Sequence, residues 1–108
     1  MLNFKQAAVN IDTINFKLVE LTEDNIDEVI KHLHKAGYLA GRSNYRKQGI
    51  YFSRTGGMDE PNQTIVGELL VVEDNTWTRL KDKKFGLSDL AIQESIKRKY
   101  DSMIRREQ

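Results

Sequence analysis

The chain of 108 residues contains no cysteine, one proline and two histidines. Without cysteine there is no disulfide, no thiolate zinc site and no thiol nucleophile, which fits a reducing compartment. No apolar run approaches the roughly 20 residues that a membrane-spanning helix needs. Residues 1–5 also lack the apolar core of a secretory signal. The sequence therefore predicts a soluble cytoplasmic protein with no membrane segment.

Acidic and basic residues nearly balance, with 16 Asp and Glu against 17 Lys and Arg. Hydrophobic residues make up 39% of the chain, which is enough for a core, and charged residues make up 31%. Domains of about 100 residues are the commonest size. We therefore expect one domain over residues 1–108, without internal repeats or linkers.

The strongest helical pattern covers residues 22–36. Its apolar residues recur at helical spacing and form one stripe: Ile26, Val29, Ile30 and Leu33. Thr22 is the predicted N-cap, and Gly37 the residue that ends the helix. A second helix is predicted over residues 88–106, with Ser88 as its N-cap. Residues 1–14 fit helical and strand spacing equally, so a helix, a strand and irregular structure all stay open there.

Strands are predicted over residues 16–21 and within residues 50–80. Residues 64–72 form a nearly continuous apolar run, which indicates burial on both faces or a bulge at Gly67. Residues 76–80 return as a partner strand, so residues 64–80 predict a β-hairpin. Residues 38–49 are rich in turn-forming residues and predict a loop.

The order of these elements predicts an α+β fold. A strand, a helix, a run of antiparallel strands and a final helix fit a two-layer arrangement. We expect a small curved antiparallel sheet of three to four strands packed against two helices. Parallel winding is disfavoured because only one helix stands between strands.

Three segments in order form a recognisable pattern: residues 19–29 (VELTEDNIDEV), residues 67–72 (GELLVV) and the aromatic pair Trp77 and Phe85. Together they resemble small tailed-bacteriophage or prophage proteins of unknown function. The similarity covers roughly residues 16–86 and departs from the family pattern at Leu69, where an aromatic is usual. The resemblance implies a phage-encoded protein in the cytoplasm of a bacterial host, without implying a chemistry.

The residues that could carry catalysis or bind a metal form no recognisable motif. His32 and His34 are two positions apart and so point to different sides of a helix, which is unsuited to a shared metal. Asp24, Asp27 and Glu28 lack the spacing of a calcium loop and suit the helix dipole instead. No phosphate-binding loop and no nucleophile elbow is present. We therefore expect no enzyme, no metal site and no cofactor.

The charges are distributed unevenly along the chain. Residues 20–28 contain five acids and no base, whereas residues 31–54 contain six bases and no acid. Tyrosines interleave with these bases, a combination that suits phosphate contact with base stacking, or an interface with an acidic protein. The candidate binding residues are Arg42, Tyr45, Arg46, Lys47, Tyr51 and Arg54.

Two functions fit this pattern, and a solvated charged face remains the plain alternative. The first is a non-enzymatic phage-encoded accessory protein that binds and modulates a host macromolecule, most simply a protein. The second is a nucleic-acid or nucleotide-binding module that uses the basic-aromatic loop at residues 38–54. The sequence leaves the oligomeric state and the identity of the partner open.

Overall fold

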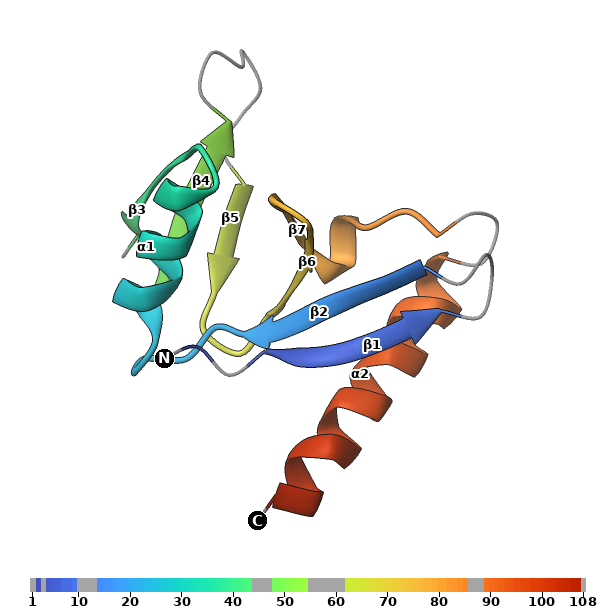
Figure 1. The fold of residues 1–108 in the computed structure, drawn as a ribbon. Coiled ribbons are helices and arrows are strands. Elements are labelled where there is room, and N and C mark those ends of the chain that lie inside the picture. The colour runs from blue at the N-terminus through green and yellow to red at the C-terminus, as the bar shows by residue number, and fades with distance from the viewer. Residues whose placement is uncertain are drawn as a thin grey trace.

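The computed structural model describes residues 2, 4–9, 14–43, 48–54, 62–85 and 89–107 (Figure 1). The elements along the chain are β1 (Lys5–Val9), β2 (Ile14–Glu20), α1 (Ile26–Lys35), β3 (Tyr38–Ser43), β4 (Gly49–Arg54), β5 (Asn62–Ile65), β6 (Leu69–Glu73), β7 (Thr76–Arg79), the 3-10 helix η1 (Leu80–Asp82) and α2 (Asp89–Glu107). All strand pairs are antiparallel. The predicted α+β class with two helices is therefore confirmed.

The strands form two sheets where the sequence predicted one. The four-stranded sheet has the order β1-β2-β6-β7, and the three-stranded sheet has the order β3-β4-β5. Figure 1 shows α1 lying against β3 and β4, while α2 crosses the four-stranded sheet near β1 and β2. Each helix thus packs mainly on a different sheet.

Gly67 divides the strands between the two sheets. Its φ of +101° lies in the region that favours glycine, and its backbone N–H donates to the carbonyl of Leu21 at 2.8 Å. The chain turns there, so the strand predicted over residues 64–72 is two strands, β5 and β6, in different sheets. The predicted hairpin is formed by β6 and β7 alone.

β6 is buried on both faces, as the apolar run predicts. Leu70 and Val72 face a core shared with α1 and the three-stranded sheet. Leu69 and Val71 face a second core shared with β2 and with Ile96 of α2. The four-stranded sheet is therefore the middle layer of the fold.

The first helix begins later than predicted. The structure places Asn25, and not Thr22, at the N-cap of α1. The Asn25 amide closes the preceding turn, because its Oδ1 accepts the backbone N–H of Thr22 and its Nδ2 donates to the carbonyl of Glu20, both at 2.8 Å. Gly37 ends the helix with a φ of +92°, as predicted.

One further expectation needs correction. Residues 38–43, predicted as part of a loop, form the edge strand β3. Residues 5–9, whose structure the sequence left open, form β1. The second helix occupies Asp89–Glu107, close to its predicted bounds, and its predicted N-cap Ser88 lies outside the described residues. No helix among the described residues has the length and apolar character that a membrane crossing requires.

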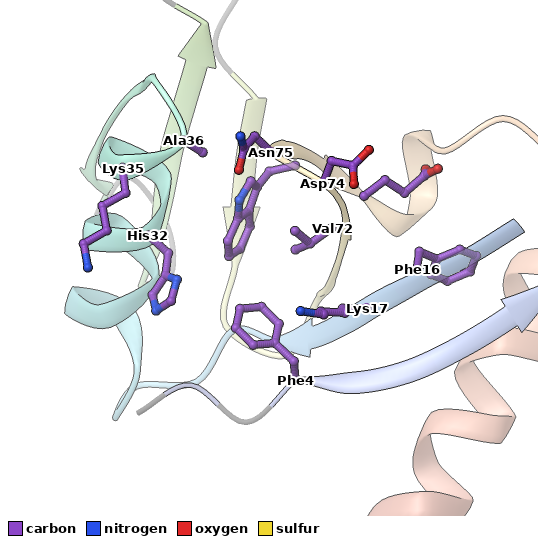
Figure 2. A pocket seen from close by; sticks show the side chains of 11 residues that line it. Phe4, Phe16, Lys17, His32, Lys35, Ala36, Val72, Asp74 and Asn75 are labelled. Atoms are coloured by element: carbon purple, nitrogen blue, oxygen red, sulfur yellow. The ribbon is translucent and has the colours of Figure 1, made fainter.

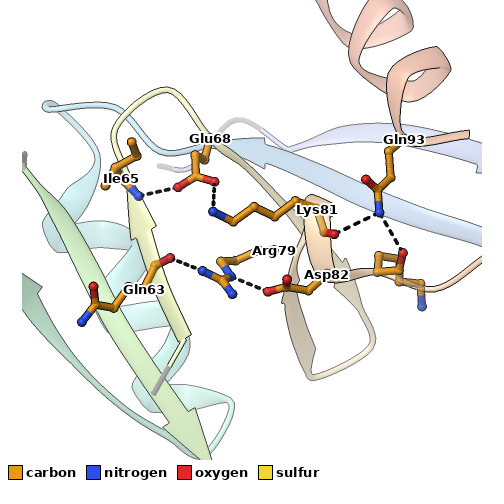
Figure 3. A network of polar contacts seen from close by, with 8 residues as sticks. Gln63, Ile65, Glu68, Arg79, Lys81, Asp82 and Gln93 are labelled. Atoms are coloured by element: carbon orange, nitrogen blue, oxygen red, sulfur yellow. Dashed lines mark hydrogen bonds and ion pairs between the residues drawn. The ribbon is translucent and has the colours of Figure 1, made fainter. Parts of the chain in front are cut away.

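Polar contacts connect the two sheets along β5 (Figure 3). Arg79 of β7 donates from Nη1 to the carbonyl of Gln63 at 2.6 Å. Glu68 accepts the backbone N–H of Ile65 at 3.0 Å and pairs with Lys81 at 3.1 Å. These contacts satisfy backbone groups at the edge of β5, a position that would otherwise be open to another strand.

Candidate functional site

The outward face of the three-stranded sheet carries no charged residue. Ile50 and Phe52 are fully buried in the core that contains α1, so the residues that alternate with them face away from the helix. The strand pairing places eight residues on this outer face: Leu39, Gly41, Ser43, Gly49, Tyr51, Ser53, Gln63 and Ile65. Because 31% of the whole chain is charged, an uncharged face of this extent is distinctive.

Three large side chains on the outer face are exposed to solvent. Leu39 on β3 is 57% exposed, Tyr51 on β4 is 41% exposed and Ile65 on β5 is 37% exposed. One lies on each strand, so the apolar groups extend across the whole width of the sheet. Exposed apolar groups gathered on one face are typical of an interaction surface.

Tyr51 lies across the backbone of Gly41 on the neighbouring strand. The two residues are direct cross-strand partners, and a Cβ added at Gly41 would lie 2.6 Å from the Tyr51 hydroxyl oxygen. The absence of a side chain at Gly41 leaves room for the ring there. The predicted binding residue Tyr51 therefore lies against the sheet with its hydroxyl end over Gly41.

Arg42 lies on the opposite side of the sheet from Tyr51 and has a partner within the chain. It is paired with Ile50, whose side chain faces α1. Its guanidinium donates to Oδ1 of Asp27 on α1, from Nη2 at 3.0 Å and from Nε at 3.2 Å. Both side chains are exposed, so the ion pair contributes little stability.

Arg54 also lies on the inner side, at the end of β4. It is paired with Tyr38, and its guanidinium carbon lies 4.6 Å from the centre of the Tyr38 ring. Nη2 donates to the carbonyl of Asn75 at 3.1 Å and to the hydroxyl of Thr76 at 3.2 Å. Arg54 therefore connects β4 to the β6–β7 hairpin.

The structure describes three of the six predicted binding residues, and it does not place these three on one face of the sheet. Tyr51 belongs to the outer face, whereas Arg42 and Arg54 lie on the inner side. The other three, Tyr45, Arg46 and Lys47, lie outside the described residues. The sequence reasoning missed Leu39 and Ile65, because it assigned the first to a loop and the second to a strand without an exposed face. Period-two spacing of uncharged residues at 39, 41 and 43 is the signal that could have revealed the outer face.

The two histidines point to different surroundings. The His34 ring nitrogen Nε2 is 3.0 Å from the carbonyl oxygen of Ala40 on β3, whereas the His32 ring lies 5.6 Å from the centre of the Phe4 ring. Within the described part of the chain, no group of three or more histidine or acidic side chains is arranged to hold a metal ion.

A separate hollow of about 260 Å³ is lined by Glu20 on β2 and by Lys97 and Tyr100 on α2. Burial, and secondarily the negative charge of Asp101 on α2, raise the pKa of Glu20 above its ordinary value of 4.5. The Glu20 carboxyl therefore holds its proton more tightly than an exposed glutamate does.

No protein-family model, curated protein or solved structure matches the chain. The relationship to phage proteins therefore stays a prediction from the sequence.

Proposed function

We propose that the protein is a non-enzymatic binding protein that docks on another protein through the outer face of the three-stranded sheet. The observation that carries the proposal is the absence of charge from all eight positions of this face. Protein interfaces are depleted in charged residues at their centre and enriched in aromatic residues. Tyr51, held against Gly41, is suited to the role of a rigid central anchor.

The character of the face favours a partner with an apolar patch of its own. Arg42 and Arg54 lie on the inner side of the sheet and have partners within the chain, so they do not border the outer face. An apolar, aromatic centre complements an apolar patch on another protein. The partner class is therefore a protein with a small exposed apolar patch.

The sequence resemblance extends this proposal to a biological setting. A phage-encoded accessory protein of this kind would bind and modulate a protein of the bacterial host, in the host cytoplasm. The resemblance in residues 16–86 is the support for this part of the proposal.

A pair of matched variants tests the docking face. Purified wild-type protein is used to capture partners, and each captured protein is then purified and titrated directly against the wild type and the variants. Tyr51→Glu places a charge at the centre of the face, and we expect it to weaken binding at least about 30-fold, which corresponds to a loss of about 2 kcal/mol. Leu90→Glu is the control, because Leu90 on α2 is 71% exposed and lies on another element.

The same experiment distinguishes a nucleic-acid module from a protein binder. A nucleic-acid partner would be lost on nuclease treatment, and its affinity would fall steeply with salt. The affinity for nucleic acid would also fall more in the double variant Arg46→Glu, Lys47→Glu than in Tyr51→Glu. That pattern, or equal binding by Tyr51→Glu and Leu90→Glu, would contradict docking through the outer face.

A further inference from the structure

A cavity of about 420 Å³ lies on the opposite side of the three-stranded sheet from the docking face. It is bordered by the last turns of α1, by β2 and by the β6–β7 hairpin (Figure 2). Its volume falls in the range of about 300–1,000 Å³ that is typical of small-molecule sites. None of the eight residues of the docking face lines it.

Aromatic side chains form one wall of the cavity. The Phe4 ring lies edge-on to two other rings, with its centre 5.6 Å from that of His32 and 6.0 Å from that of Trp77. Trp77 is only 5% exposed, and its backbone N–H donates to the hydroxyl of Tyr38 at 2.9 Å. Trp77 is therefore held in place before any ligand arrives, and together with Phe4 and His32 it gives the cavity an aromatic border.

Lys17 supplies positive charge beside the aromatic wall. Its Nζ lies 5.8 Å from the centre of the Phe4 ring, and Figure 2 shows the Lys17 side chain directed toward Phe4. Lys35 stands at the rim, on the last turn of α1. Within the described residues, neither lysine has an ion pair. The ammonium of Lys17 is thus available to an anionic ligand.

The two acids at the cavity do not cancel this charge. Glu73 is paired with Lys83, and the Asp74 carboxylate in Figure 2 is directed away from Phe4. A cationic ligand is disfavoured, because Lys17 already occupies the position over the Phe4 ring. A doubly charged phosphate is disfavoured more than a singly charged carboxylate, because one ammonium, that of Lys17, is directed toward the wall and the adjoining end of α1 carries the negative end of the helix dipole.

We propose that this cavity binds a small aromatic carboxylate, with its ring against Phe4 and Trp77 and its carboxylate at Lys17. A single carboxylate matches the one ammonium directed toward the aromatic wall, as a charge-assisted hydrogen bond requires. The flat ring matches the wall in shape and polarity. This site is independent of the proposed docking face and uses none of its residues.

The indole N–H signal of Trp77 provides the test, because Trp77 is the single tryptophan of the chain. Benzoate, benzamide and benzylamine are titrated into ¹⁵N-labelled protein at constant ionic strength and pH. We expect benzoate to shift the indole signal saturably in the millimolar range. Benzamide, which has the same ring without the charge, should bind about tenfold more weakly, and benzylamine more weakly still.

A matched pair of variants locates the charge that is recognised. Lys17→Gln should weaken benzoate binding about tenfold and leave benzamide binding unchanged. Lys31 is an exposed lysine of α1 that does not line the cavity, so Lys31→Gln should change neither benzoate binding nor benzamide binding. The proposal is overturned if benzoate gives no saturable shift, if benzamide binds as well as benzoate, or if the two lysine variants behave alike.

Discussion

Tyr38 is the residue that most directly joins the two sheets. From β3, its hydroxyl oxygen accepts the backbone N–H of Trp77 on β7 at 2.9 Å, and both residues are buried. Tyr38→Phe leaves that buried N–H without its acceptor, so we expect the free energy of unfolding in urea to fall by about 2 kcal/mol. Tyr51→Phe is the control, because the exposed Tyr51 hydroxyl should contribute less than about 0.5 kcal/mol. Equal losses in both variants would contradict this role of Tyr38.

Glu20 makes the stability of the protein depend on pH. Burial, together with the nearby charge of Asp101, raises its pKa above 4.5, so the folded state binds a proton more tightly than the unfolded state. Protonation of Glu20 therefore stabilises the folded state at low pH, and this stabilisation is lost as pH rises from 4.5 through the raised pKa. Glu20→Gln should therefore increase stability at neutral pH and flatten its decline in this window.

Urea unfolding of the wild type and Glu20→Gln between about pH 4.5 and pH 7 measures this effect. Glu23→Gln is the matched control, because Glu23 is exposed in the turn before α1. Parallel stability curves for the wild type and Glu20→Gln would show that burial of Glu20 has no such consequence.

At the scale of elements, two glycines of the three-stranded sheet should respond differently to substitution. A Cβ at Gly49 would lie 2.2 Å from the backbone oxygen of Thr64 on β5, whereas a Cβ at Gly41 would meet the movable end of the Tyr51 side chain. Gly49→Ala must separate β4 from β5, and we expect it to cost about 3 kcal/mol. Gly41→Ala should cost less than about 1 kcal/mol, because the ring can swing away and alanine suits a strand better than glycine. Thermal melts of the two variants would contradict this account if Gly41→Ala were the less stable.

The elements that the sequence predicted correctly are those with strong local signals. The apolar stripe of α1 and its end at Gly37 needed no information from the rest of the chain. β3 was missed because Gly41 suggests a turn locally, whereas in the fold it makes room for Tyr51 on another strand. The N-cap was misplaced because Asn25 uses its amide to close the preceding turn, so the helix begins after it.

At the scale of the whole molecule, the candidate docking face illustrates what one sequence cannot provide. Leu39, Tyr51 and Ile65 are far apart in the chain and share a face only because β3, β4 and β5 pair in one register. The basic residues were visible in the sequence, but alternation along the strands separates Arg42 and Arg54 from Tyr51. Charge counting therefore pointed to residues 31–54, and only the strand pairing shows which side of this sheet faces away from the core.

The two cores should unfold together because β6 contributes to both. Leu70 is fully buried in the core that contains α1, and its neighbour Val71 is 1% exposed in the core that contains α2. We expect Leu70→Ala to cost about 3 kcal/mol and Val71→Ala about 2 kcal/mol, each as a shift of one cooperative transition. Leu70→Asp should abolish cooperative unfolding, because an unpaired buried charge costs several kcal/mol, much of the stability of a domain this size. Circular dichroism reports both helices and near-ultraviolet signals report Trp77, so coincident melts by the two probes check the prediction. A biphasic melt in either alanine variant would instead show that each core is a separate folding unit.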